Sequence, residues 1–209
     1  MIGTETIFTY GAPQLKFGAG ASDEIGYDLA QLGVTRVLVV TDPGVAATGL
    51  PERVAERIRG FGVRAEVYDQ AHVEPTDQSL RAAIDEVRSR GMFDGFVAVG
   101  GGSAIDTAKA INLMTSCEGD LMDYINAPVG GGKAPTGPLK PLVAVPTTTG
   151  TGSESTTIVL PTIACPTSAS RSAISLPDRS VSTVRVSDTV STATLTGMNL
   201  RSMTRLRSG

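Results

Sequence analysis

Two short loops in this sequence carry residue types that bind phosphate and sugar groups. The first, Gly100-Gly101-Gly102-Ser103, follows the apolar run Val97-Ala98-Val99. The second, residues 147–153, follows Val143-Ala144-Val145 and holds four threonines, two glycines and Ser153. Glycine lets a backbone approach a ligand closely, and threonine hydroxyls both donate and accept hydrogen bonds. Either loop alone also fits a plain tight turn, but together they favour a nucleotide site.

The glycine run matches neither of two common phosphate-binding patterns. No Gly-Lys-Ser/Thr follows it at the spacing of a Walker loop, and the third glycine of a dinucleotide GxGxxG motif is replaced by Ile105. Ser103 and Asp106 have the spacing of a capping box. We therefore expect them to organise the start of a helix whose dipole and free N–H groups favour an anion.

The elements that position these loops alternate between strands and helices. Short β-branched runs predict strands at 36–42, 64–69, within 93–102 and at 141–148, and apolar stripes predict helices at 22–32, 50–59, 76–91 and 103–115. Residues 6–20 look like a β-ribbon. This order predicts an α/β fold, a Rossmann-like parallel sheet with flanking helices. Since ligands lie beyond the carboxyl ends of parallel strands, both loops should open onto one cleft.

Composition limits the partners and the compartment. A net charge of −3 over 209 residues gives no reason to propose nucleic acid or a membrane surface. No signal peptide or membrane span is visible. Cys117 and Cys165 lack zinc-type spacing and fit inert thiols in a reducing compartment. We expect a cytoplasmic protein.

The last quarter of the chain differs in kind from the rest. Residues 1–154 hold 12 Lys and Arg and 19 Asp and Glu, whereas residues 155–209 hold six Arg and two Asp. The latter segment contains 11 Ser and 10 Thr, but no Glu, Lys, Gln, His, Phe or Tyr. Such a composition supplies little core area or helix propensity. We predict a domain over residues 1–157 and a Ser/Thr/Arg-rich tail over 158–209 that is poorly ordered or frameshifted.

The two loops together resemble the iron-containing (group III) alcohol dehydrogenases. The pattern Gly100-Gly101-Gly102-Ser103-x-x-Asp106-x-x-Lys109 and the pattern Pro146-Thr147-Thr148-x-Gly150-Thr151-Gly152-Ser153-Glu154 occur in the order typical of that family. The segments "LMDYINAPVGGGKAPTGPLKPLVAVP" and "YDQAHVEPTDQSL" are most similar to its hydroxyacid-oxoacid transhydrogenase branch. The similarity runs from about residue 8 to residue 157.

This resemblance implies the N-terminal domain of the dehydroquinate synthase-like fold, with NAD(P) as cofactor. The positions that it assigns to the cofactor are Asp42, Gly101, Gly102, Ser103, Asp106, Thr147, Thr148 and Thr151. Gly101, Gly102 and Ser103 would meet the pyrophosphate, and the threonines would meet ribose, phosphate or nicotinamide. Asp42 would face the adenosine ribose, where a carboxylate disfavours the 2′-phosphate of NADP. Glu74 departs from the family, many members of which carry Asn before the proline.

The resemblance also implies a divalent metal, usually iron, held by one Asp and three His in a C-terminal helical domain. This sequence has a single histidine, His72, which lies in the nucleotide-binding half. We therefore expect the histidine ligands to be absent from this chain and the helical domain to be missing or aberrant, and we assign no catalytic residue. The resemblance further implies a small-molecule alcohol or hydroxyacid as substrate and the ability to form a homo-oligomer.

Three functions remain open at this point. The first is an oxidoreductase that moves a hydride between the cofactor and an alcohol or 2-hydroxy acid, with a hydroxyacid-oxoacid transhydrogenase as a variant. The others are a non-catalytic NAD-binding module and an inactive fragment. We expect this chain to bind the cofactor without turnover.

Overall fold

The structure is a computed structural model that describes residues 14–155 together with the backbone of five short strands beyond them. Those strands are β6 (Ile158–Val159), β7 (Thr162–Ala164), β8 (Ala169–Arg171), β9 (Ile174–Ser175) and β10 (Ser182–Val186). The first part of the predicted β-ribbon, residues 6–13, lies outside the described residues, as does Cys165.

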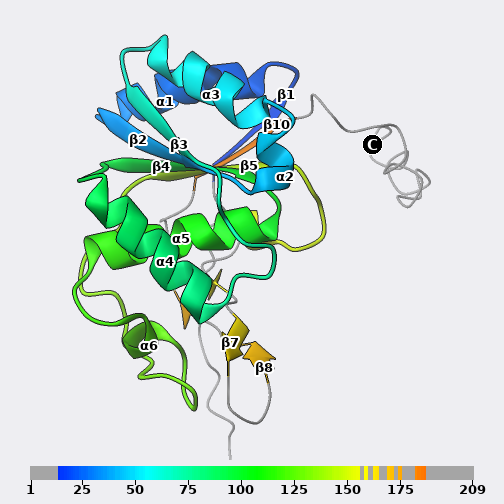
Figure 1. Cartoon of the computed structure of the whole chain (residues 1–209). Coiled ribbons are helices and arrows are strands. Elements are labelled where there is room, and N and C mark those ends of the chain that lie inside the picture. Colours follow the sequence, from blue (N-terminus) through cyan, green and yellow to red (C-terminus); the bar gives the residue numbers. More distant parts are fainter. Residues whose placement is uncertain are drawn as a thin grey trace, which may run out of the picture.

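A parallel sheet forms the centre of the described part of the chain (Figure 1). The strands follow the order β1 (Leu15–Gly18), β10, β5 (Leu142–Pro146), β4 (Gly95–Gly100), β2 (Arg36–Val40) and β3 (Arg64–Tyr68). Every neighbouring pair in this order is parallel. All six residues of β4 are buried, which is typical of a strand covered on both faces.

Helices cover both faces of the sheet (Figure 1). The helical elements are η1 (Ala21–Glu24), α1 (Ile25–Gln31), α2 (Pro43–Ala46), α3 (Leu50–Arg59), α4 (Asp77–Ser89), α5 (Gly102–Ser116), α6 (Leu121–Tyr124) and η2 (Ser153–Ser155). The helices α1 and α3 lie on one face, and α4 and α5 lie on the other. The prediction of an α/β fold with a Rossmann-like parallel sheet is confirmed. Within the described residues, no helix has the length and apolarity needed to cross a bilayer.

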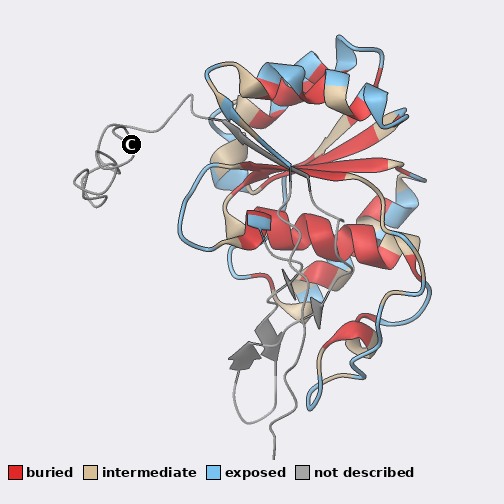
Figure 2. Ribbon diagram, turned by 180° about the vertical axis from the view of Figure 1, so that it is seen from behind, coloured by how far each residue is buried: buried red, intermediate tan, exposed pale blue. Residues whose placement is uncertain are grey.

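Two hydrophobic cores follow from the alternation of side chains along the strands. Leu38 and Phe96 pack with α4 and α5, whereas Val37 and Val97 pack with α1 and α3. Residues one apart in a strand point to opposite faces, so β2, β3, β4 and β5 each supply both cores. Helix α5 is buried along most of its length (Figure 2), because the sheet covers one side of it and α4 packs beside it.

The predicted helix at 76–91 is observed as α4, which runs from Asp77 to Ser89. Thr76 is the N-cap, and its hydroxyl accepts a hydrogen bond from the Ser79 N–H at 3.1 Å. The Ser79 hydroxyl in turn accepts one from the Thr76 N–H at 2.9 Å. Gly91 follows the helix with φ of +94°, a conformation that favours glycine.

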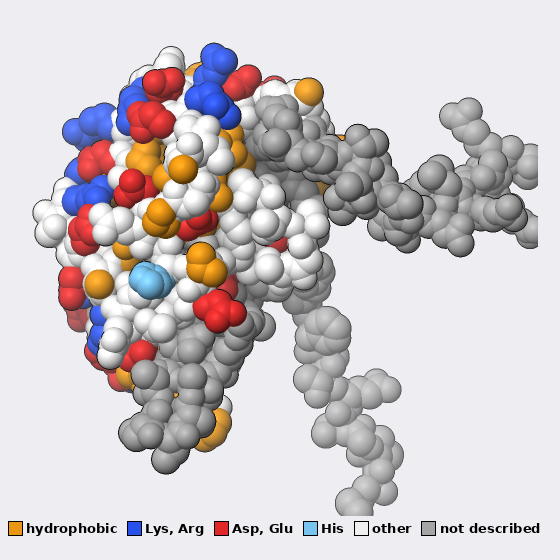
Figure 3. Space-filling model, turned by 45° about the vertical axis from the view of Figure 1, so that its right-hand side comes forward, with side chains coloured by type: hydrophobic (Ala, Val, Ile, Leu, Met, Phe, Trp, Pro, Cys, Tyr) orange, Lys and Arg blue, Asp and Glu red, His pale blue; other side chains and the backbone are white. Residues whose placement is uncertain are grey.

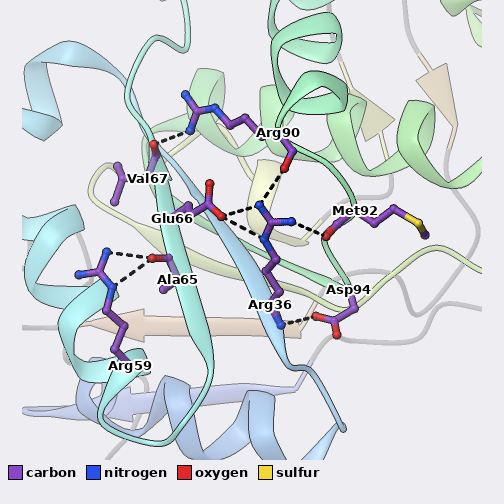
Figure 4. A network of polar contacts seen from close by, with 8 residues as sticks. All are labelled: Arg36, Arg59, Ala65, Glu66, Val67, Arg90, Met92 and Asp94. Carbon is purple, nitrogen blue, oxygen red and sulfur yellow. Dashed lines mark hydrogen bonds and ion pairs between the residues drawn. The ribbon is translucent and has the colours of Figure 1, made fainter.

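A polar network holds the amino ends of three strands together (Figure 4). The Arg36 guanidinium, at the start of β2, donates to the Glu66 carboxylate of β3 at 2.6 Å. It also donates to the Arg90 carbonyl oxygen at 2.8 Å. The Asp94 carboxylate, just before β4, accepts from the Arg36 N–H at 2.8 Å. This network lies at the opposite end of the sheet from the two loops.

Two arginines cover the outer edge of β3 (Figure 4). Arg59 donates to the carbonyl oxygen of Ala65 at 2.8 Å, and Arg90 donates to that of Val67 at 3.0 Å. An uncovered strand edge offers unpaired backbone groups to another chain. The two guanidinium groups therefore occupy acceptors that a further strand would need.

The predicted division into residues 1–157 and a tail at 158–209 remains a prediction. Most of the tail lies outside the described residues, but the backbone of β10 pairs with β1 on one side and β5 on the other. The Ser/Thr/Arg-rich composition did not predict this strand.

Candidate functional site

The two predicted loops lie side by side at the carboxyl edge of the sheet. The strands β4 and β5 are neighbours, and Gly100 is in register with Pro146. The Thr147 N–H donates to the Gly100 carbonyl oxygen at 3.0 Å, one residue beyond the strands. The two loops therefore meet at one edge of the sheet, whereas the cleft expected between them stays a prediction.

The glycine loop leads directly into the long, buried helix α5. Gly100 has φ of +155°. Gly101 is the N-cap residue, and because it has no side chain it leaves the N–H groups of the first turn uncapped. An α-helix leaves its first N–H groups without intrahelical acceptors. The start of α5 thus presents backbone donors and a positive dipole end, the arrangement that binds phosphate in nucleotide folds.

The prediction that Ser103 and Asp106 form a capping box is wrong. The helix begins one residue before Ser103, so Ser103 is not the N-cap. The Ser103 hydroxyl instead accepts a hydrogen bond from the Glu74 N–H at 3.1 Å. Asp106 is only 7% exposed and lies 3.7 Å from the Lys109 ammonium. Ser103 therefore links α5 to the segment before α4, and Asp106 belongs to a buried ionic cluster.

The threonine-rich loop packs closely against the glycine loop, so that a side chain on Gly101 or Gly102 would displace its neighbours. A Cβ atom added to Gly101 would lie 3.0 Å from the Thr148 hydroxyl oxygen. One added to Gly102 would lie 3.0 Å from the Ser153 hydroxyl oxygen and 3.1 Å from the Thr151 hydroxyl oxygen. These distances are shorter than ordinary van der Waals contact. The glycines thus bring a loop of hydroxyl groups to the start of α5.

The threonines of the second loop are open to solvent. Thr147, Thr148 and Thr151 are all exposed, although Thr148 and Thr151 also contact the glycine loop. The Thr151 hydroxyl accepts from the Ser153 N–H at 3.4 Å. Their hydroxyl groups are accessible to a ligand that occupies the carboxyl edge.

Asp42 lies beside the glycine loop, at the carboxyl end of β2. Its carboxylate caps the short helix α2 and accepts from the Val45 N–H at 3.0 Å. Its Oδ2 would lie 3.3 Å from a Cβ atom on Gly100. Since β2 and β4 are neighbours, the structure brings Asp42, the glycine loop and the threonine-rich loop to one edge.

A buried ionic cluster of Asp106, Lys109 and Glu154 lies at the start of η2, and sequence reasoning had assigned a role only to Asp106. Lys109 is 1% exposed, and its ammonium donates to the Ser153 carbonyl oxygen at 2.5 Å. Glu154 is 3% exposed and interacts electrostatically with Lys109. Burial lowers the pKa of Lys109, and the Asp106 and Glu154 carboxylates oppose that shift. The motif spacing Asp106-x-x-Lys109 was the one sequence signal for this cluster.

Glu74 has an unusual backbone conformation at the site. Its φ is +54°, in the left-handed region that Asn and Gly adopt most readily. The N–H that it donates to Ser103 holds the segment before α4 against the start of α5. The Asn carried by many family members at this place would suit the same backbone.

The described residues do not assemble a metal site. Among them, no group of three or more His, Cys, Asp and Glu side chains is placed to hold an ion. His72 is exposed on the face seen in Figure 3. Cys117 is buried, and its thiol is free rather than part of a disulfide. No reaction step is therefore assigned to a metal held by these residues.

Comparison with known proteins identifies what the chain resembles. The iron-containing alcohol dehydrogenase family model matches residues 12–169. A mitochondrial hydroxyacid-oxoacid transhydrogenase from Bos taurus is 45% identical over 158 residues, which are 75% of this chain and 34% of that protein. Its Xenopus laevis counterpart is 46% identical over the same shares. The chain thus spans about a third of the length of these curated relatives.

Solved structures show the same similarity in three dimensions. A 1,3-propanediol oxidoreductase superposes with a TM-score of 0.73 at 31% identity, covering 87% of this chain and 46% of its own. A sulfoacetaldehyde reductase from Bifidobacterium kashiwanohense, solved in complex with NAD⁺, gives a TM-score of 0.73 at 26% identity over the same shares.

The expectation of a cytoplasmic protein is contradicted by these comparisons. The curated relatives from Bos taurus, Xenopus laevis and Homo sapiens are all named as mitochondrial. Charge, cysteine content and the lack of a visible signal peptide do not distinguish the cytoplasm from the mitochondrial matrix, because both compartments are reducing.

Proposed function

Because this chain belongs to the iron-containing alcohol dehydrogenase family, we propose that its described domain binds the NAD of an oxidoreductase acting on an alcohol or a 2-hydroxy acid. The contact between Gly102 and the threonine-rich loop carries this proposal. This contact brings backbone donors and hydroxyl groups together, and Asp42 lies beside Gly100 at the same edge of the parallel sheet. Folds of this kind bind nucleotides at that edge.

The residues of the glycine loop would hold the pyrophosphate. The backbone of Gly101 and Gly102 and the first turn of α5 provide N–H donors, and the absence of Cβ atoms lets the phosphates come close. Ser103 lies in the same turn and supports it through Glu74. Asp106 would contribute only indirectly, through its interaction with Lys109 in the buried cluster, since a carboxylate in contact with pyrophosphate would repel it.

The residues of the threonine-rich loop would hold the other half of the cofactor. Thr147, Thr148 and Thr151 expose hydroxyl groups that can donate to ribose or phosphate oxygens and accept from the nicotinamide amide. Bound NAD supplies the hydride acceptor of an alcohol oxidation. These loops would orient that acceptor and contribute no proton transfer of their own.

Asp42 would select NAD over NADP. Its position beside Gly100 suits the adenosine ribose, whose hydroxyl groups can donate to a carboxylate. A 2′-phosphate at the same place would bring two negative charges together.

A hydroxyacid-oxoacid transhydrogenase is a second candidate, favoured by the names of the relatives at 45% and 46% identity. Such an enzyme oxidises one 2-hydroxy acid while it reduces a different 2-oxo acid, so the cofactor returns to its starting state.

The experiment is a pair of assays on the chain with NAD and added iron or zinc. A dehydrogenase releases NADH when a 2-hydroxy acid or a simple alcohol is supplied alone. A transhydrogenase moves deuterium from a labelled 2-hydroxy acid to an added 2-oxo acid without accumulation of NADH. If calorimetry shows NAD binding but neither activity is found, the function of this chain is cofactor binding alone. If NAD does not bind, the proposal is wrong.

A further inference from the structure

The Lys109 side chain connects helix α5 to the far end of the threonine-rich loop. Its ammonium lies 2.5 Å from the carbonyl oxygen of Ser153, the residue that begins η2. The Ser153 hydroxyl in turn lies 3.0 Å from where a Cβ atom on Gly102 would be. The near end of the same loop is fixed by the hydrogen bond from Thr147 to Gly100. Both ends of the loop are therefore anchored, while its threonines remain exposed.

Stability alone is a poor explanation for a lysine at this position. Lys109 is 1% exposed and Asp106 is 7% exposed, and desolvating two charged groups costs several kcal/mol that their attraction repays only in part. Replacing a buried ion pair by apolar side chains is often neutral or stabilising. An apolar residue of similar length would fill the same space but would leave the Ser153 carbonyl oxygen without this donor.

Direct attraction of the cofactor by Lys109 is also a poor explanation. The Asp106 and Glu154 carboxylates both interact with the ammonium, so the cluster as a whole brings no excess positive charge toward a phosphate. Lys109 is also covered by the loops from which a ligand would approach. Its effect on the cofactor must therefore pass through the backbone that it holds.

We propose that Lys109 is a positioning residue for NAD, which fixes the threonine-rich loop against the glycine loop through the carbonyl oxygen of Ser153. This inference rests on the proposed function, because it requires that the two loops bind the cofactor. The other members of the cluster assist, since the Asp106 carboxylate lies 3.7 Å from the ammonium and both Asp106 and Glu154 favour its charged form against the effect of burial on its pKa.

The test compares Lys109→Met with a matched control on the same helix. Asn112 is also buried in α5, but its amide donates to the Lys140 carbonyl oxygen at 2.7 Å, near the amino end of β5. Asn112→Leu therefore removes a buried polar contact of α5 at the opposite edge of the sheet. For both variants, NAD affinity is measured by calorimetry, the midpoint of thermal unfolding by circular dichroism, and the mobility of residues 147–153 by amide hydrogen exchange.

We expect Lys109→Met to weaken NAD binding by about tenfold or more, the equivalent of losing one charge-assisted hydrogen bond. Amide exchange of residues 147–153 should accelerate in the same variant. Asn112→Leu should change the unfolding midpoint but leave NAD affinity within about twofold. A Lys109→Met protein that binds NAD as the parent does, or an Asn112→Leu protein that loses affinity equally, would overturn the inference.

Failure of a variant to fold, or of the parent chain to bind NAD, also has a defined meaning. If Lys109→Met does not fold, Lys109→Met combined with Asp106→Asn removes the donor to Ser153 without leaving the Asp106 carboxylate buried beside an apolar side chain, and the same loss of affinity is expected. If no Lys109 variant folds while Asn112→Leu does, the residue serves folding and the inference is wrong. If the parent chain itself fails to bind NAD, the proposed function fails, which is distinct from a parent that binds and a Lys109 variant that binds equally well.

Discussion

Gly102 and Ser153 come from different loops, yet a Cβ atom on Gly102 would lie only 3.0 Å from the Ser153 hydroxyl oxygen. This contact joins the loop after β4 to the loop after β5. It exists because the two strands are parallel neighbours that end at one edge of the sheet. This proximity brings the hydroxyl groups of one loop to the backbone donors of the other.

Gly102→Ala should weaken NAD binding without a comparable loss of stability. The added methyl group must displace the Ser153 and Thr151 side chains by a few tenths of an ångström, and the shifted hydroxyl groups should lower the NAD affinity by about tenfold. Gly102 is the first residue of α5, where alanine favours the helix. Calorimetry measures the affinity, and thermal unfolding measures the stability.

Gly137→Ala is the control for that variant. A Cβ atom on Gly137 meets no atom within 4 Å, so the same chemical change occurs in open space. Equal NAD affinity in the two alanine variants would show that the contact between the loops does not matter for binding.

Asp42→Ser should shift the preference from NAD toward NADP. Serine can still accept from the Val45 N–H and cap α2, while the charge that opposes a 2′-phosphate is removed. Two unit charges 4 Å apart repel by about 1 kcal/mol in water and by about 4 kcal/mol near a protein surface. The ratio of the NADP to the NAD dissociation constant should therefore fall by about tenfold. An unchanged ratio would place the adenosine ribose elsewhere.

Glu74→Asn should stabilise the protein. Asparagine adopts the left-handed conformation of this residue, φ +54°, at a lower cost than glutamate. We expect the free energy of unfolding to rise by about 1 kcal/mol, measured by urea denaturation. The exposed Glu118, which does not have a positive φ, gives the control substitution Glu118→Asn. An equal effect of both substitutions would mean that backbone strain at Glu74 is not the cause.

Asp120→Asn should remove part of the acid sensitivity of the fold. The hydrogen bonds from Arg81, at 2.5 and 2.7 Å, lower the pKa of Asp120 to about 2. Because the unfolded chain takes up this proton more readily, the stabilisation is complete above about pH 4 and is lost as the pH falls toward 2. Both side chains are more than a third exposed, so the effect should stay below about 1 kcal/mol.

Urea denaturation between pH 2 and pH 7 measures the loss. Arg81→Gln should reproduce it, and the double variant should add little to either single change, since both remove the same contact. Full additivity of the two substitutions would contradict a direct Arg81–Asp120 interaction.

The sequence predicted those features of the fold that depend on local pattern. The helix at 50–59 has the predicted bounds, and the helix predicted at 76–91 is α4, from Asp77 to Ser89. The meeting of the two loops was also predictable, because parallel strands place their carboxyl ends at one edge. These predictions needed only side-chain periodicity and the geometry of a parallel sheet.

Features that depend on long-range packing were not predicted or were predicted wrongly. Ser103 has a capping-box partner at the right spacing, but its hydroxyl bonds to Glu74, 29 residues away in sequence. Lys109 reads as one residue of a motif, whereas its partner Ser153 lies 44 residues further on. The strand β10 has no apolar run of the usual kind and is defined by its pairing with β1 and β5. Helix α2 is too short to show periodicity.

A calorimetric titration of the whole chain with NAD tests the central claim most directly. At a temperature where circular dichroism shows the protein to be folded, the two loops predict saturable binding to one site, weakened in Gly102→Ala and unchanged in Gly137→Ala. A folded chain that shows no saturable binding up to several millimolar NAD, or a Gly102→Ala variant that binds as tightly as the parent, would contradict the assignment of a cofactor site to this edge of the sheet.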